Sequence, residues 1–394
     1  MAKQTVDQLD LSGRRVFLRV DWNVPLDGGR ITDDTRITAA LPTVEHCLKA
    51  GAALVLASHL GRPKGKPDPR YSLGPVAARL AEILGQPVPL APDCIGPAVE
   101  EQARALTPGQ VLMLENLRFH AEEETNDEAF ARRLAVLGDV YVNDAFAAAH
   151  RAHASIDAIT RCLQPAVAGL LMARELLALG RIVSAAERPV WAILGGAKVS
   201  DKLALVLNLL TRVDGVLIGG GMAFTFLAAL GHGVGRSLVE LDRIDTARLM
   251  LERARSAGIP LRVPVDVVVA TGVSEPTGLR TVSIREIPSD MMGLDIGPLT
   301  VSQFGAALKG AKTVVWNGPM GVFEEKAFAA GTLGVARAVA ECGGFSVVGG
   351  GDTIAAIQQA GVASRMGYIS TAGGAFLEYL EGRVLPGVAA LNDA

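Results

Sequence analysis

The chain has 394 residues, 49% of them hydrophobic, and a formal net charge of −3. A single hydrophobic core rarely organises more than about 300 residues, so we expect two domains. The sequence pI of about 6.1 argues against a nucleic-acid-binding protein, because such proteins normally carry a strong excess of basic residues.

The start of the chain, MAKQTVDQLDLSGRR, is too polar for a secretory signal. No CxxC pair occurs among the four cysteines, which favours reduced thiols and a cytoplasmic location. The uncharged stretch 215–235 is long enough for a membrane-spanning helix. Its consecutive glycines instead indicate a buried strand, a glycine turn and a helix beginning near Met222, so we expect no membrane partner.

The first half alternates short β-rich runs with patterns of helical spacing, which is typical of a parallel sheet covered by helices. The expected strands are 15–20, 53–58, 110–114 and 140–143, and the expected helices are 36–50, 73–84 and 127–135. In open sheets of this kind, ligands bind beyond the carboxyl ends of the strands.

Polar or cationic side chains follow each of these strands, and they converge if the strands are adjacent. Arginine pairs with carboxylates and phosphates through two parallel hydrogen bonds, so several arginines at one sheet edge predict a small, multiply anionic ligand. The side chains gathered in this way include those of Asp21, Asn23, Ser58, His59, Arg62, Glu115, Asn116, Arg118, Asn143, Asp144, His150, Arg151 and His153, and Arg36 could join them.

Each of these side chains also has a structural alternative. Arg19 and Arg36 could pair with Asp21 or Asp33, and a lone histidine is more often a structural group than a ligand.

A zinc site is another interpretation of the histidines His59, His150 and His153. No thiolate and no HExxH spacing accompanies them, so we favour an anion site over a metal site here.

The apolar pattern over 165–185 indicates a helix that connects a cationic first half to a glycine-rich second half. A surface helix within one domain is the alternative.

The second half repeats the rhythm of strand, turn and helix, with expected strands at 190–194, 216–218, 262–269, 313–316 and 345–348. This predicts a second doubly wound sheet, whose glycine-lined strand ends let a ligand touch the backbone. Lys198 and Lys202 lie four residues apart in the first turns of an expected helix, with Leu203, Val206 and further leucines on its apolar side. An anion fits beside the free N–H groups there; an ordinary turn with solvated lysines is the alternative.

A glycine run, 349–351, followed by Asp352 and Thr353, ends the last of these strands. The glycines let the main chain curl around phosphates, and an expected helix at 354–359 points its positive end at them. Asp352 offers the hard oxygen that Mg²⁺ prefers, or it caps the helix, and the two roles can coexist. A similar helix start at 370–375 contains Gly373 and Gly374.

A series of motifs runs in order from about residue 19 to the C-terminus: RVDWNVP, SHLGRPKG, ENLRF, DAFAAAHRAHAS, GGAKVSDK, MMGLDIGP, WNGPMGVFE, GGGDT and STAGG. Through these motifs the chain resembles the phosphoglycerate kinase family. The resemblance implies an α/β fold of two doubly wound, Rossmann-like domains joined by a helical hinge. It also implies reversible transfer of the acyl phosphate of 1,3-bisphosphoglycerate to ADP, giving 3-phosphoglycerate and ATP.

By similarity, the first domain, 1–165, holds phosphoglycerate and 166–185 forms the hinge. The implied phosphoglycerate residues, all of them among the side chains gathered above, are Asp21, Asn23, Arg36, His59, Arg62, Arg118 and Arg151. The second domain, 186–375, holds the Mg-nucleotide, and the segment 376–394 returns to the first domain. The implied nucleotide residues are Lys198, Lys202, Gly293, Glu324, Gly350, Gly351, Asp352 and Thr353, with Asp352 as the ligand of Mg²⁺.

Phosphoryl transfer needs in-line placement and compensation of charge on the equatorial oxygens. The resemblance implies Lys198 and Arg36 for that compensation, assisted by the amides of Gly373 and Gly374. Because the substrates start on separate domains, we expect hinge closure to bring them together and to expel water. The family also implies a monomer.

Trp22, Ala147 and Ala372 depart from the usual family pattern, where Phe, Gly and the first Gly of a GGG run stand. A Cβ at 372 would strain a left-handed backbone, so the turn that presents Gly373 and Gly374 could shift.

Two other functions compete with the kinase. The first is a dinucleotide-dependent oxidoreductase. It is opposed because the sequence lacks a GxGxxG run followed by an acidic residue at the expected distance. A catalytically silent nucleotide-binding or anion-binding protein is opposed by the presence of Lys198, Arg36 and Asp352.

Overall fold

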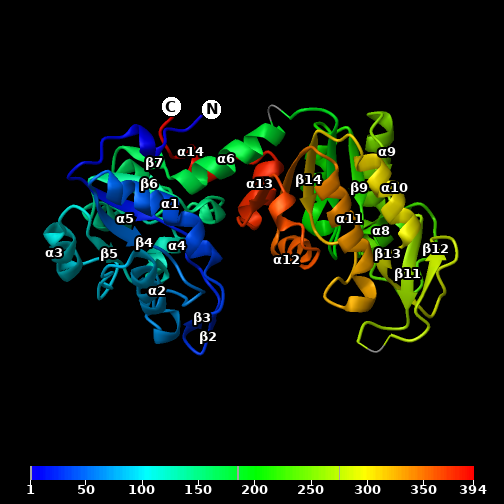
Figure 1. Ribbon diagram of the computed structural model, residues 1–394, viewed down its shortest axis with the longest axis horizontal. Coiled ribbons are helices and arrows are strands. Elements are labelled where there is room, and N and C mark those ends of the chain that lie inside the picture. The colour runs from blue at the N-terminus through cyan, green and yellow to red at the C-terminus, as the bar shows by residue number, and fades with distance from the viewer. Residues whose placement is uncertain (1, 184–185, 275) are drawn as a thin grey trace. The chain divides into compact units, whose positions relative to one another are not determined.

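The computed structural model describes residues 2–183, 186–274 and 276–394. The chain forms two compact units, Met1–Leu177 together with Val384–Ala394, and Ala178–Arg383. Each unit contains a parallel sheet with helices packed around it, which confirms the predicted fold class (Figure 1). No helix in the described part of the chain is long and apolar enough to cross a membrane.

The first unit is built on a five-stranded parallel sheet in the order β5–β4–β1–β6–β7. The order reverses between β1 and β6, and this is the point where doubly wound sheets form their ligand crevice. The strands are β1 (Arg15–Arg19), β4 (Ala53–Ala57), β5 (Val111–Met113), β6 (Val140–Asn143) and β7 (Ala166–Ala168). The helices are α1 (Thr35–Lys49), α2 (Gly74–Leu84), α3 (Pro97–Ala105), α4 (Ala121–Glu124) and α5 (Glu128–Ala135), and β2 (Leu26–Asp27) and β3 (Arg30–Ile31) form a hairpin.

The end of the chain belongs to the first unit. The N–H of Gln4 donates to the carbonyl of Asn392 at 2.9 Å, and the N–H of Asn392 donates to the carbonyl of Ala166 at 2.9 Å. Figure 1 accordingly draws the two chain ends next to each other, beside α14 (Pro386–Ala389). This return begins at Val384, later than residue 376, where the sequence placed it.

The second unit carries a six-stranded parallel sheet in the order β10–β9–β8–β14–β15–β16, which reverses between β8 and β14. Its strands are β8 (Val190–Leu194), β9 (Gly215–Ile218), β10 (Leu261–Arg262), β14 (Thr313–Asn317), β15 (Phe345–Gly349) and β16 (Tyr368–Ser370). Its helices are α7 (Leu203–Leu209), α8 (Met222–Ala229), α9 (Ile244–Ser256), α10 (Pro298–Leu308), α11 (Ala330–Glu341), α12 (Gly351–Gln359) and α13 (Gly374–Leu380). Because α13 contacts α7, it belongs to this unit.

A separate antiparallel sheet also belongs to the second unit, although the sequence predicted only parallel strands there. Its order is β12–β11–β13, formed by β11 (Asp266–Ala270), β12 (Arg280–Ser283) and β13 (Met292–Ile296). The single strand expected at 262–269 was therefore wrong. Pro264 separates β10 from β11, and the two strands pair in different sheets, because proline cannot donate to a strand ladder.

The expected helix at 165–185 is a strand followed by a shorter helix. Its first residues form β7, which pairs with β6, and the helix α6 (Leu170–Val183) begins after Gly169. Side chains from elsewhere in the unit fix this start, because Thr43 Oγ1 accepts the N–H of Leu170 at 2.9 Å and Asp144 Oδ1 accepts that of Met172 at 3.0 Å. The last two positions, 184 and 185, lie outside the described residues.

Candidate active site

The carboxyl ends of β1 and β4 bring together a carboxylate, an imidazole and a guanidinium. Arg36 Nη1 donates to Asp21 Oδ2 at 2.7 Å, and His59 Nε2 lies 3.8 Å from Asp21 Oδ1. Burial favours a raised pKa for Asp21, but the charges of Arg36 and Arg19 and the N–H of Asn23 outweigh it and lower that pKa. Burial lowers the pKa of His59 well below its ordinary value, although Asp21 opposes the effect. At neutral pH the group therefore holds an ionised Asp21 and a neutral His59.

The loop after β4 is fixed from two sides at Gly61. Asn23 Oδ1 accepts the N–H of Gly61 at 2.8 Å, and Arg118 Nη1 donates to its carbonyl at 2.9 Å. Arg62 follows directly and is exposed, whereas Arg118 is buried. Asn23 and Arg118 thus lie at the same loop as Arg62, as the argument from strand ends predicted.

A buried ionic network beneath this group went unrecognised in the sequence. Arg19 Nε donates to Ser155 Oγ at 2.8 Å, and Arg19 Nη2 lies 3.1 Å from His59 Nδ1. Glu123 Oε1 lies 4.0 Å from Arg19 Nη2, and this carboxylate accepts both the N–H and the Oγ–H of Ser155. Arg19 therefore has Glu123 as its ion pair, so the alternative that paired it with Asp21 or Asp33 was wrong. The same alternative is confirmed for Arg36, which pairs with Asp21.

Arg151 is exposed, and its Nε donates to His150 Nε2 at 3.2 Å. Burial, together with the charges of Arg19 and Arg118, lowers the pKa of the nearby His153 to about 3. His153 is therefore neutral at physiological pH.

The turn that carries the two lysines differs from the predicted helix start. A 3₁₀ turn (Ser200–Lys202) comes first, and α7 begins only at Leu203, so Lys198 and Lys202 do not share a helix face. Glu240 is the physical reason, because its carboxylate accepts the N–H groups of Val199 and Ser200 at 2.5 and 3.0 Å. These N–H groups therefore serve a carboxylate from another segment.

The buried face of α7 agrees with the prediction in part. Val206 and, just after the helix, Leu210 are buried as predicted. Leu205 and Leu209 are buried in place of Leu203 and Leu207, which are only partly buried.

Lys202 and Lys198 lie in different environments. Lys198 is exposed, whereas Lys202 is buried and its Nζ donates to Asn317 Oδ1 at the end of β14. Burial lowers the pKa of Lys202 to about 8, with Asp201 and Asp352 opposing the effect.

The glycine run after β15 forms the N-terminal end of α12. Gly350 precedes the helix with φ of +95°, a value that favours glycine, and Thr353 Oγ1 accepts the N–H of Gly318 at 2.7 Å. The helix starts at Gly351, earlier than predicted, so Asp352 lies inside its first turn and is exposed. Gly350 is the capping residue and no side chain caps this helix, so the alternative of Asp352 as a cap was wrong.

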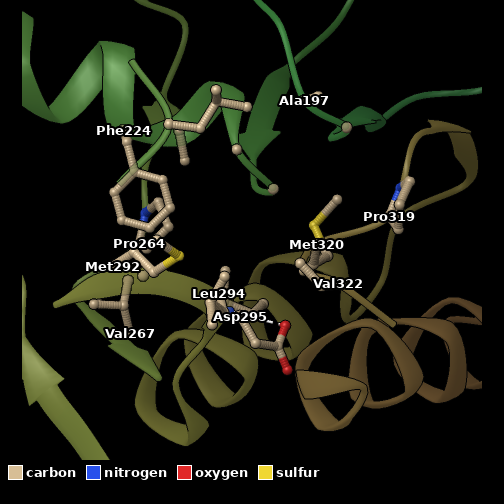
Figure 2. Close-up of a pocket in the computed structure, with 18 of the residues that line it drawn as sticks. Ala197, Phe224, Pro264, Val267, Met292, Leu294, Asp295, Pro319, Met320 and Val322 are labelled. Carbon is tan, nitrogen blue, oxygen red and sulfur yellow. Dashed lines mark hydrogen bonds between the residues drawn. The ribbon is translucent and has the colours of Figure 1, made fainter. Parts of the chain in front are cut away.

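A cavity of about 510 Å³ opens in the second unit, between the segments that follow β8, β9 and β14 and the strands β11 and β13 of the antiparallel sheet. Figure 2 shows Phe224, Pro264, Met292 and Val267 grouped at one side of it, with Met320 and Val322 across from them. Its polar lining residues are Arg236, Asp295, Glu324 and Asp352.

Close packing shapes the wall of this cavity. A Cβ at Gly293 would lie 2.1 Å from the Phe224 ring, so only glycine lets the ring lie against the strand. Asp295 accepts the N–H groups of Ile296 and Gly331 at 2.9 and 2.6 Å, while burial raises its pKa to about 7. Of the predicted nucleotide residues, Gly293, Glu324 and Asp352 line the cavity.

The turn before α13 has its left-handed residue at Gly373 and not at Ala372. Gly373 caps the helix with φ of +55°, while Ala372 is buried and has no left-handed backbone. The strain expected at Ala372 was therefore wrong, because the residue that requires glycine is the next one.

A sequence model of the family described as phosphoglycerate kinase matches residues 6–383. The chain belongs to the phosphoglycerate kinase family. The phosphoglycerate kinases of Pelotomaculum thermopropionicum and Moorella thermoacetica are 55% and 54% identical to it, each alignment covering 100% of both chains. The phosphoglycerate kinase structure from Coxiella burnetii superposes with a TM-score of 0.92 at 41% identity, covering 98% of each chain. The resemblance carried by the motifs is thus confirmed.

Proposed function

We propose that the first unit of this kinase holds phosphoglycerate and that the second holds the Mg-nucleotide. The reaction is the family's reversible phosphoryl transfer between 1,3-bisphosphoglycerate and ADP, which gives 3-phosphoglycerate and ATP. The observation that supports the assignment of sites is the contrast between the residues of the two units. Arg36, Arg62, Arg118 and Arg151 follow the strands of the first unit, whereas the cavity of the second unit is mainly apolar.

The phosphoglycerate would lie against the side chains at the ends of β1 and β4. The Arg36 side chain is 35% exposed, and its guanidinium is paired with Asp21. Arg62 and Arg151 are exposed and free to approach a phosphate, and Asn23 and Arg118 fix the loop that presents Arg62.

The nucleotide would place its base in the cavity beside Gly293, with Glu324 near the ribose. The apolar lining suits a flat aromatic ring, because ligand sites of this size are mostly apolar with a few polar groups. Its phosphates would meet Lys202 and the first turn of α12, where the N–H groups of Gly351, Asp352 and Thr353 have no partner within the helix.

Asp352 fits the role of Mg²⁺ ligand, because its carboxylate is exposed in the first turn of α12 and lines the cavity. A bound Mg²⁺ would neutralise part of the phosphate charge during transfer. Carboxylate oxygen is the donor that this ion prefers.

For catalysis we assign charge compensation to Lys198 and Arg36, with the amides of Gly373 and Gly374 assisting. Lys198 suits this role because its ammonium is exposed on a turn that Glu240 fixes. A carboxylate is already an ionised nucleophile in the reverse direction, so no general base is needed.

The two substrates occupy different units in this scheme, so we propose that the units approach each other through a hinge at α6 when both substrates are bound. Such closure would exclude the water that hydrolyses an acyl phosphate. Small-angle X-ray scattering with both ligands should give a smaller radius of gyration than with either alone, and an unchanged radius would contradict the hinge.

We further propose a cytoplasmic monomer that acts on small molecules without nucleic-acid or membrane partners. The four cysteines are all free, which suits a reducing compartment.

A coupled assay that follows ATP formation from ADP and 1,3-bisphosphoglycerate tests the function directly. The kinase predicts turnover, whereas an oxidoreductase or a silent binding protein predicts none. Variants of Arg36 and Asp352 in the same assay would test the two sites separately.

A further inference from the structure

A group of three potential metal ligands lies in the first unit, apart from the residues assigned to the reaction. One donor atom each from Asp93, Cys94 and His120 lies within 4.8 Å of the other two. His120 Nε2 is 2.7 Å from Asp93 Oδ1. The Cys94 side chain is fully buried, whereas those of Asp93 and His120 are 41% and 25% exposed, so the group is reached from solvent on one side.

The backbone holds this group in place from two directions. The segment before Asp93 runs beside β5, because the N–H of Ala91 donates to the carbonyl of Met113 at 2.7 Å. His120 comes from the chain after β5, and its ring lies against Phe130 with the ring centroids 5.3 Å apart. The N–H of Cys94 donates to Asp93 Oδ1 at 2.6 Å, which orients the carboxylate.

We propose that Asp93, Cys94 and His120 bind one Zn²⁺ ion. A thiolate, an imidazole and a carboxylate are all ligands that zinc accepts, whereas Mg²⁺ prefers oxygen donors only. Donors around a tetrahedral zinc ion lie roughly 3.5 Å apart, given metal–ligand bonds of about 2.0–2.3 Å. That spacing lies between the 2.7 Å of the closest pair and the 4.8 Å limit of the group, so small side-chain movements suffice.

Without a cation, the three side chains form a hydrogen-bonded group. Asp93 accepts from His120 and from the Cys94 thiol, and burial holds the pKa of that thiol well above its ordinary value. On binding, the Cys94 sulfur loses its proton to solvent and forms the bond to zinc. The neutral His120 ring shifts its single proton from Nε2 to Nδ1 and binds through Nε2, so it releases none. One proton is released for each ion, and three protein ligands leave a fourth position for water.

Cobalt(II) is the probe for this site, because it takes the same ligands and reports a bound thiolate through a charge-transfer absorption in the near ultraviolet. The full chain, stripped with a chelator, should bind one equivalent of Co²⁺ with this absorption, and Zn²⁺ should remove it. Cys94→Ser should abolish the absorption, and His120→Gln should weaken Zn²⁺ binding in equilibrium dialysis at least tenfold. Cys162→Ser, which changes a cysteine outside the group, should leave both readouts unchanged.

Far-ultraviolet circular dichroism would show that each variant is folded, and His120→Gln keeps the test decisive if Cys94→Ser fails to fold. The proposal is overturned if the wild-type chain binds no stoichiometric metal. It is also overturned if the absorption survives in folded Cys94→Ser, or if Zn²⁺ affinity is unchanged in His120→Gln.

Discussion

The affinity of the second unit for nucleotide should fall as the pH rises above neutrality, because of Lys202. Burial lowers the pKa of this lysine to about 8. A lysine with that pKa is about 90% charged at pH 7 and about 10% charged at pH 9. Only the ammonium form attracts phosphates, so at pH 9 most of the protein must take up a proton before it binds.

The size of the effect follows from these fractions. The dissociation constant of Mg-ADP should rise about tenfold between pH 7 and pH 9, which corresponds to about 1.4 kcal/mol of binding free energy. The second pKa of a phosphate group lies at about 6, so the nucleotide is mostly ionised by pH 7 and itself adds little in this range. Isothermal titration calorimetry at pH 7, 8 and 9 in the presence of excess Mg²⁺ would measure the change.

Lys202→Arg is the matched control, because a guanidinium stays charged throughout this range. The variant should bind Mg-ADP with an affinity that is nearly independent of pH, whatever its absolute value. A wild-type affinity that is constant from pH 7 to pH 9, or a variant with the wild-type slope, would refute the reasoning.

Further predictions concern single substitutions. Lys198→Ala should lower kcat at least ~100-fold, which is the scale of losing one group that stabilises transition-state charge. The nucleotide dissociation constant should be less affected. Turnover comparable to that of the wild type would show that Lys198 takes no part in phosphoryl transfer. Arg62→Ala should mainly raise the KM for phosphoglycerate, and an unchanged KM would contradict its role. Glu123→Ala should lower the free energy of unfolding in urea by about 3–5 kcal/mol, because it leaves buried Arg19 without its ion pair, whereas exposed Glu122→Ala should stay within about 0.5 kcal/mol. Gly373→Ala should reduce kcat, because alanine disfavours the positive φ of this residue and would shift the amides of the turn. Full activity in that variant would argue against the proposed amide contact.

Local patterns in the sequence determined the parallel strands and most of the turns that follow them. The limits of β8 were predicted to the residue, and α8 begins at Met222, near which its start was predicted. These elements are buried on most sides and are bounded by glycines, so their limits depend on neighbouring residues alone. The order of the motifs along the chain was likewise sufficient to identify the family.

Contacts between distant segments decided what the sequence could not. Glu240 delays the start of α7, Glu123 takes Arg19 as its partner, and pairing with β6 converts the first residues of an expected helix into β7. The antiparallel sheet beside the cavity depends in the same way on which strands meet. A short apolar run or a single carboxylate has several compatible partners, and only the folded chain selects one of them, because the free energy of each pairing depends on everything packed around it.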